Sequence, residues 1–102
     1  MDDLNPSLIF KALAHPMRRQ ILTWLRSPEE FEPQEHPDSV VHGICLSSIR
    51  HRAGITQSMT SQHMAALERA GLVVSRRLGQ WTHYRRDEEV LQRFAAHVTH
   101  DL

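Results

Sequence analysis

The 102-residue sequence has few cysteines and glycines and no long apolar run, and each of these absences excludes a class of protein. It contains one cysteine, Cys45, so no disulfide can form within the chain, and we expect a protein of the reducing cytoplasm. No apolar run approaches the roughly 18 residues of a membrane span, and the acidic start, residues 1–3, is unlike a signal peptide. None of the four glycines lies in a phosphate-binding loop or a nucleophile elbow. We therefore expect neither a membrane protein nor an enzyme.

A net charge is also missing, because twelve basic and twelve acidic residues cancel. Their distribution along the chain is uneven. Residues 27–40 hold five acids and no Lys or Arg, whereas residues 41–86 hold seven arginines and a single acid, Glu68. Eleven of the twelve basic residues are Arg, which binds phosphate or guanine in a bidentate manner better than Lys does. The basic segment indicates a nucleic-acid partner, with a solvated basic face as the alternative.

Residues 55–72 are predicted to form the helix around which the rest is organised. Thr56 is a suitable N-cap, and Gly71 can end the helix in a left-handed conformation. An apolar stripe recurs at i, i+4 and i+7, formed by Thr60, Met64 and Leu67. The first turns carry neutral hydrogen-bonding side chains and no acid, as a helix that enters a DNA groove requires. The predicted DNA contacts are Gln57, Ser58, Thr60, Ser61 and Gln62. The alternative is an ordinary surface helix.

The flanking segments predict a winged helix-turn-helix. Residues 46–53 are predicted to form a short helix, and Gly54 provides the tight turn between it and the next helix. After Gly71 the apolar period changes to two, and two strands flank Gly79-Gln80, a two-residue hairpin turn. Arginines 76, 77, 85 and 86 are expected around the tip, where such a wing reaches DNA phosphates; an edge hairpin kept soluble by Arg is the alternative. The predicted phosphate contacts are Arg50, Arg52, Arg76, Arg77 and Arg85.

The whole pattern predicts one domain over residues 1–102, mainly α with a small β-hairpin. Helices are expected at residues 6–13, at 17–25 and from 87 onward. The first and last helices carry more apolar surface than one small core can use, which predicts a dimer through these two helices. Residues 27–42, acidic and with three prolines, predict an exposed, mobile loop insertion. Val40-Val41 is expected to start a short strand that runs to Cys45.

Three strings resemble the ArsR/SmtB family of bacterial winged-helix repressors: ALAHPMRRQIL at 12–22, ITQSMTSQHM at 55–64 and LERAGLV at 67–73. The segment around Gly79-Gln80-Trp81 also resembles the family's wing. The resemblance spans nearly the whole chain except the acidic segment. It implies a homodimeric repressor that binds a double-stranded DNA operator and is released by an inducer. By position, His63 matches a structural residue, and the family's DNA-contacting positions are matched by Gln57, Ser58, Ser61 and Gln62.

The family's inducer sites are matched poorly. Arsenic-sensing members carry Cys-x-Cys at the start of the helix before the DNA-reading helix. Here Cys45 matches the first cysteine, but Ser47 stands at the position of the second, and one thiolate is too few to bind a metalloid ion. Zinc-type members use Asp-x-His and, after a gap of ten residues, His-x-x-His or His-x-x-Glu on the last helix. Here a gap of seven residues separates Asp87-x-Glu89 from His97-x-x-His100. We therefore expect no cofactor. The weaker candidates that remain are a metal site of His97, His100 and Asp101 on one helix face and a redox role for Cys45.

Two function hypotheses follow from these patterns. The first is a dimeric, sequence-specific DNA-binding repressor with no membrane partner. The alternative is a winged-helix module that works mainly through protein–protein contacts of its acidic loop and outer helices.

Overall fold

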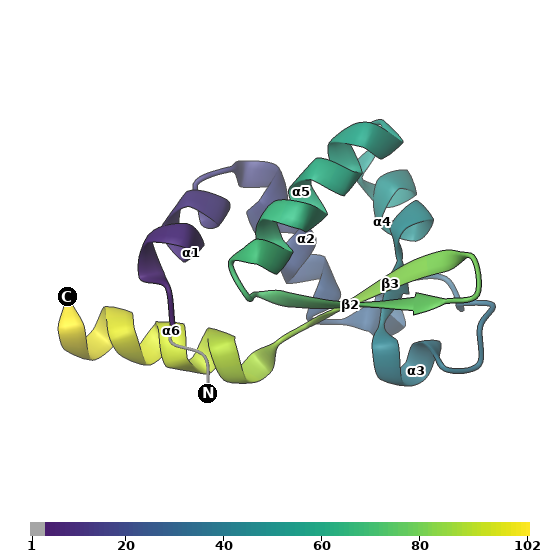
Figure 1. Cartoon of the computed structure of the whole chain (residues 1–102). Helices are drawn as coiled ribbons and strands as arrows, with labels where there is room; N and C mark the ends of the chain where they lie inside the picture. The colour runs from purple at the N-terminus through teal and green to yellow at the C-terminus, as the bar shows by residue number, and fades with distance from the viewer. Residues whose placement is uncertain (1–3) are drawn as a thin grey trace.

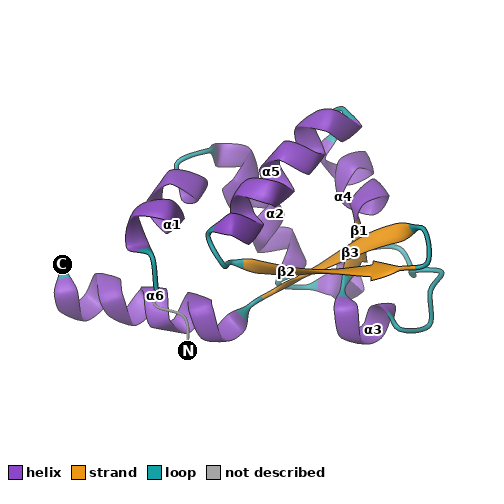
Figure 2. Cartoon of the chain, in the orientation of Figure 1, coloured by secondary structure: helices purple, strands orange, loops and turns teal. Residues whose placement is uncertain are grey.

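The computed structural model describes residues 4–102, so the acidic start at residues 1–3, used above against a signal peptide, lies outside the described residues. Within these described residues, six helices, a short 3-10 turn and a three-stranded sheet follow one another (Figures 1 and 2). None of the described helices combines the length and the apolar character needed to cross a bilayer. In order, the elements are α1 (Pro6–Leu13), α2 (Pro16–Leu25), η1 (Pro28–Glu30), α3 (Ser39–His42), β1 (Ile44–Cys45), α4 (Leu46–Ala53), α5 (Gln57–Arg69), β2 (Val73–Leu78), β3 (Trp81–Arg86) and α6 (Glu88–Asp101).

The helix ends follow the predicted local chemistry. Asn5 caps α1 by accepting a hydrogen bond from the Leu8 amide at 3.2 Å, and Thr56 caps α5 by accepting from the Met59 amide at 3.1 Å. Helix α5 ends in a Schellman motif. The Gly71 amide donates to the Glu68 carbonyl at 2.9 Å, and the Leu72 amide donates to the Leu67 carbonyl at 3.0 Å. Gly71 has a φ of +80°, which permits this ending. The predicted start and stop of α5 are both confirmed.

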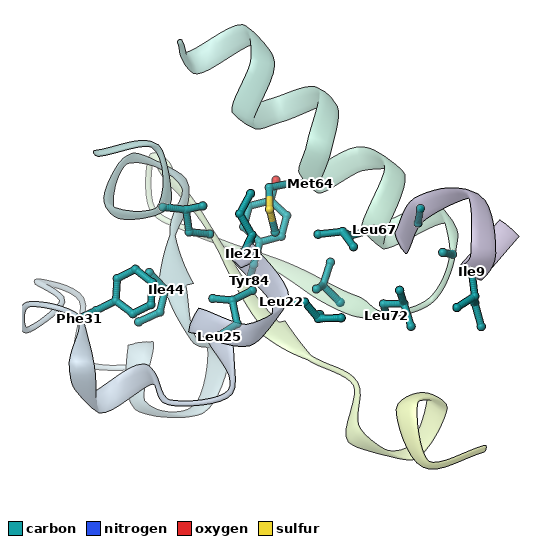
Figure 3. Packing of buried hydrophobic residues seen from close by; sticks show 14 residues of the cluster. Ile9, Ile21, Leu22, Leu25, Phe31, Ile44, Met64, Leu67, Leu72 and Tyr84 are labelled. Atoms are coloured by element: carbon teal, nitrogen blue, oxygen red, sulfur yellow. The ribbon is translucent and has the colours of Figure 1, made fainter. Parts of the chain in front are cut away.

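Helix α5 packs one of its faces on the core, to which it contributes Met64 and Leu67. Figure 3 shows Met64 and Leu67 of α5 facing Ile21 and Leu22 of α2 and side chains of the sheet. The predicted stripe is confirmed, because Thr60, Met64 and Leu67 are all fully buried. Burying a Leu or Met side chain stabilises a fold by about 1.5–3 kcal/mol. This packing fixes which face of α5 points away from the protein.

The sheet has the strand order β1-β3-β2 and is antiparallel throughout. The predicted hairpin is confirmed: β2 and β3 are joined by Gly79-Gln80, with Leu78 opposite Trp81. The strand predicted from Val40 is wrong in its first half. Val40 and Val41 lie in α3, where the His42 amide bonds the Asp38 carbonyl at 3.1 Å, and both valines are exposed. Because no sheet partner or core covers them, the local helical turn prevails over their β propensity.

The acidic segment is anchored rather than fully exposed as predicted. Phe31 contributes its ring to the core and is 9% exposed. Gln34 accepts a hydrogen bond from the Cys45 amide at 3.0 Å and donates one to Ser48 Oγ at 3.3 Å. Burial of this aromatic side chain and the two hydrogen bonds of Gln34 together offset the cost of ordering the segment. The acids themselves remain on the surface.

The turn into β1 depends on Gly43. Its φ is +95°, and a Cβ at this position would overlap the Tyr84 carbonyl oxygen and lie 2.6 Å from the Tyr84 carbonyl carbon. Replacing Gly43 with Ala is expected to cost about 3 kcal/mol, since left-handed strain adds to backbone overlap. Gly54, with a φ of +69° and nothing within 4 Å of its Cβ position, is the matched control. Gly54→Ala is expected to cost only about 1 kcal/mol. Urea unfolding measures both, and equal losses would contradict this role of Gly43.

Candidate nucleic-acid interface

The outward face of α5 carries four of the five DNA contacts predicted on this helix. Gln57, Ser58 and Gln62 are exposed and Ser61 is half-buried. Together with Ala65 these four line one shallow depression on the surface. Their spacing of i, i+1, i+4 and i+5 places them on a single helix face. The core packing of the opposite face holds this face outward, at the end of α5 whose free amides carry partial positive charge.

Thr60, the fifth residue, was a wrong prediction. Its side chain is fully buried, and its Oγ1 donates a hydrogen bond to the Thr56 carbonyl at 2.8 Å. A buried hydroxyl on the core stripe cannot reach a base edge. Residue type pointed to DNA contact, but the helical period already placed Thr60 with Met64 and Leu67, and the period was the better guide.

Met59 is a surface residue of α5 that the sequence analysis missed. Its apolar side chain is 46% exposed. With Arg50 and the Gly54 turn it lines a second depression, between α4 and α5. Its position outside the i, i+4, i+7 stripe was the available signal. An exposed apolar side chain beside a reader face can contact the methyl group of thymine.

The five arginines predicted to hold phosphates separate into two groups. Arg50, Arg76, Arg77 and Arg85 are exposed. Arg52 is exposed too but has partners within the protein: its guanidinium lies 4.7 Å from the ring centroid of Trp24, 4.8 Å from that of Phe31 and 4.0 Å from a Glu30 carboxylate oxygen, and its phosphate contact stays a prediction. Stacking and pairing of this kind hold a guanidinium in place. Arg52 therefore joins α4 to α2 and the acidic segment.

The hairpin register shows which of the four arginines expected around the wing tip lie there. Arg77 and Arg76 pair with Thr82 and His83, close to the turn, and Arg77 Nε donates to the Gly79 carbonyl at 3.0 Å. Arg85 pairs with Val74 at the base of the hairpin. Arg86, also at the base, bonds the Leu22 carbonyl at 3.2 Å and Glu88 at 2.9 Å. A two-residue turn fixes this register, so only Arg76 and Arg77 lie near the tip.

His63 is buried on α5 as a structural residue, in agreement with its predicted role. Its Nδ1 accepts a hydrogen bond from Arg18 Nε at 3.1 Å, and its ring lies 4.5 Å from that of His15. Burial lowers the pKa of His63, and the positive charges of His15 and Arg18 lower it further. A neutral ring therefore accepts from Arg18 at neutral pH. The contact joins α2 to α5.

The metal candidates on the last helix form only a pair. His97 Nδ1 lies 3.2 Å from Asp101 Oδ2, while the side chain of His100 is exposed. Within residues 4–102, no group of three His, Cys, Asp or Glu side chains is arranged to hold a metal ion. Cys45 is half-buried at the start of α4, with its Sγ 3.3 Å from the hydroxyls of Ser47 and Ser48.

Helices α1 and α6 lie together at the end of the molecule away from the hairpin tip and α4 (Figure 1). No residue of α6 is fully buried. Phe94 of α6 packs edge-to-face on Phe10 of α1 at 5.1 Å, yet Phe10 remains 45% exposed and Val98 42% exposed. These residues, with Leu8, define what we call the α1/α6 face. An apolar face of this kind on a small domain is typical of a protein–protein interface.

Comparison with known proteins places this geometry in a family. No protein-family model matches the chain. The HTH-type transcriptional regulator YbzH of Bacillus subtilis is 42% identical over 93 residues, which cover 90% of this chain and 93% of that protein. The arsenic resistance transcriptional regulator ArsR1 of Pseudomonas putida is 30% identical over 89 residues, which cover 87% of this chain and 59% of that protein. The chain belongs to the ArsR family of winged-helix transcriptional regulators.

Solved structures agree with the ArsR family fold. A winged helix-turn-helix DNA-binding domain from Mycobacterium bovis, described as homodimeric, superposes with a TM-score of 0.64 at 29% identity and covers 93% of this chain and 77% of that one. An ArsR-like transcriptional regulator from a Rhodococcus species superposes with a TM-score of 0.69 at 24% identity, covering 92% of this chain and 76% of that one. The second likeness concerns the fold alone. The resemblance read from the sequence is thereby confirmed.

Proposed function

We propose that this ArsR-family regulator is a homodimeric repressor, acting in the cytoplasm, that binds a double-stranded DNA operator and is released by an inducer. The whole chain would act as one DNA-binding domain, with residues 27–42 as an insertion. The observation that carries the proposal is the acid-free outer face of α5, formed by Gln57, Ser58, Ser61 and Gln62. Such a face beside exposed arginines suits a negatively charged partner that offers hydrogen-bonding groups.

Base recognition is assigned to α5. Gln57 and Gln62 each carry an amide that can bond adenine N6 and N7 together, and Ser58 and Ser61 can donate to or accept from either base of a pair. Met59 adds an apolar contact next to them. Because α5 begins at Gln57, its free amides also face the DNA backbone, which favours a phosphate there.

Phosphate binding is assigned to the arginines on either side of α5. Arg50 extends from the last turn of α4, and Arg76 and Arg77 from the wing near its tip. Arg85 lies farther from the tip, at the base of the hairpin, so its contact would need DNA that reaches past the wing. Such contacts fix the position of a protein on DNA and carry most of the salt dependence of binding.

Dimerisation is assigned to the α1/α6 face. Its side chains Leu8, Phe10 and Val98 remain 38%, 45% and 42% exposed, and α5 lies on another part of the molecule (Figure 1). A two-fold axis through this face would present two copies of α5 to one side. Two reader helices related in this way match a palindromic operator with half-sites about one helical turn apart.

The alternative, a module that binds protein, draws support from Val40 and Val41, which are 93% and 66% exposed in the acidic segment. Titration with random duplex DNA at low salt separates the two functions. We expect micromolar binding that weakens steeply as salt is added. Absence of binding at micromolar protein would favour the protein-binding module.

Two substitutions should separate base contact from phosphate contact. Arg77→Ala is expected to weaken binding to all sequences alike and to reduce the slope of log K against log salt by about one unit, because one phosphate contact is lost. Gln57→Ala is expected to keep the slope and to relax the preference at one base position by about 1–3 kcal/mol. Fluorescence anisotropy over a salt series measures both quantities. If the salt-dependence slope of Arg77→Ala equalled that of the wild type, the assignment of the wing to the DNA interface would be wrong.

A further inference from the structure

A cavity of about 330 Å³ lies between α1, α2 and α5. Its volume falls in the range of roughly 300–1,000 Å³ that is typical of sites for small molecules. None of the proposed DNA contacts lines it, so the assigned function makes no use of it. Its wall combines basic and apolar side chains, which are Leu8, Lys11, Ala12, Arg18, Ala66 and Arg69.

Three cations from three helices meet in this cavity. Lys11 belongs to α1, Arg18 to α2 and Arg69 to α5, and none of the described residues on the wall is acidic. Within residues 4–102, none of the three forms a salt bridge. Like charges held around one cavity repel one another, and a bound anion would relieve that repulsion. The cavity is therefore suited to a ligand with more than one negative charge.

Arg18 is the most firmly positioned of the three cations. Its Nε donates to Nδ1 of His63 on α5 at 3.1 Å, its one side-chain hydrogen bond within the described part of the chain. The neutral ring holds the guanidinium without cancelling its charge, and the fork of the two Nη groups stays available. Such a fork binds two oxygens of a phosphate at once. Arg18 also lies in the first turn of α2, where the helix dipole favours an anion.

The rest of the wall is apolar and indicates that the ligand has a carbon body. Leu8, Ala12 and Ala66 carry no hydrogen-bonding side chain, and Leu8 is 38% exposed. An inorganic ion would leave this apolar surface uncovered. Leu8 also belongs to the α1/α6 face, so the cavity opens next to the proposed dimer interface.

We propose that this cavity binds a small phosphate monoester with an apolar body. A phosphate monoester carries nearly two negative charges at pH 7 and three strong acceptor oxygens, which match three cations better than one carboxylate does. Its oxygens accept hydrogen bonds from the Arg18 fork, from Lys11 and from Arg69, and its carbon body lies on Leu8 and the two alanines. The site goes beyond the proposed function, because this binding does not need DNA.

The first test is calorimetric titration at low salt with three probes: phenyl phosphate, inorganic phosphate and benzoate. Phenyl phosphate is expected to bind about tenfold more tightly than the other two, because inorganic phosphate lacks the apolar body and benzoate carries a single charge. Equal affinity for all three probes would overturn the site.

Matched variants distinguish the cavity from a general attraction of anions. Arg69→Gln is expected to bind phenyl phosphate about tenfold more weakly than the wild type, because a charged donor is lost. Arg26→Gln makes the same change of charge at an exposed position outside the cavity and is expected to bind as the wild type does. Equal losses in the two variants would overturn the site.

His63 supplies a readout at the site itself. Burial lowers the pKa of His63, and the positive charges of His15 and Arg18 lower it further. A dianion bound to the Arg18 fork is expected to raise that pKa, since it offsets the charge of Arg18. Nuclear magnetic resonance titration of the His63 ring, with and without phenyl phosphate, measures the change. A pKa that phenyl phosphate leaves unchanged would contradict the placement of the ligand on Arg18.

The phosphates of DNA are the other source of this chemistry, and a DNA titration separates the two. Arg69→Gln is expected to keep the wild-type slope of log K against log salt, because the cavity is not a DNA contact. A slope reduced by about one unit, as expected for Arg77→Ala, would assign the cavity to the DNA backbone and overturn the proposal. If the wild type bound no DNA, the proposed function would fail, while the phenyl phosphate titrations would still decide this site.

Discussion

Replacing Val98 with aspartate is expected to leave a folded monomer whose affinity for operator DNA is roughly 1,000-fold lower than that of the wild type, close to non-specific binding. Val98 is 42% exposed on α6, so the monomer gains no buried charge from the substitution. In a two-fold dimer through the α1/α6 face, each substitution appears twice and brings unpaired carboxylates into an apolar contact, which costs several kcal/mol. A monomer then reads only one half-site.

Sedimentation equilibrium and fluorescence anisotropy measure the two effects of Val98→Asp. Val40→Asp is the matched control, because Val40 is 93% exposed and lies in α3, outside the α1/α6 face. The control is expected to remain dimeric and to bind DNA as before. A Val98→Asp protein that stayed dimeric would place the dimer interface elsewhere on the molecule.

The second large effect is expected from Ser58→Glu. Ser58 is exposed at the second position of α5, where a carboxylate near the helix N-terminus stabilises an isolated helix by about 0.3–1 kcal/mol. The fold should therefore be as stable as before or slightly more stable. Against DNA, the same carboxylate would face phosphates and base edges, and like-charge contact costs several kcal/mol. We expect roughly a 1,000-fold loss of affinity for every sequence tested.

Thermal unfolding and DNA titration together distinguish this effect from damage to the fold. Gln20→Glu makes the same change of charge on an exposed position of α2 and is expected to bind DNA nearly as the wild type does. Loss of DNA binding by both variants would show that the change in net charge alone weakens binding. Unchanged DNA binding by Ser58→Glu would contradict the proposal that α5 lies in the groove.

Elements with strong local signals were predicted well from the sequence. The Thr56 cap, the Gly71 stop and the Gly79-Gln80 turn each depend on chemistry within a few residues, and each is present. The apolar period of α5 also decided which of its faces is buried. The outward face of the candidate site followed directly, since a helix with a known buried stripe has a known exposed one.

Contacts between residues far apart in the chain could not be predicted from the sequence. Arg52 is held by Trp24 and Phe31, which lie 28 and 21 positions away from it, and no local pattern reveals that stacking. The pairing of Cys45 with His83 needs β1 to join the hairpin, which only the folded sheet defines. The Arg85 error was avoidable, because a two-residue turn already fixes the hairpin register. Spacing in sequence was mistaken there for position in space.

Dimethyl sulfate footprinting on a selected operator tests directly whether two outward α5 faces lie in the major groove. The reagent methylates guanine N7, an acceptor exposed in the major groove. We expect two protected patches, about 10 base pairs apart on one face of the duplex, and their joint loss in the Val98→Asp variant. A bound complex with fully reactive guanines, or with a single protected patch, would contradict the assignment of α5 as the reader helix of a two-fold dimer.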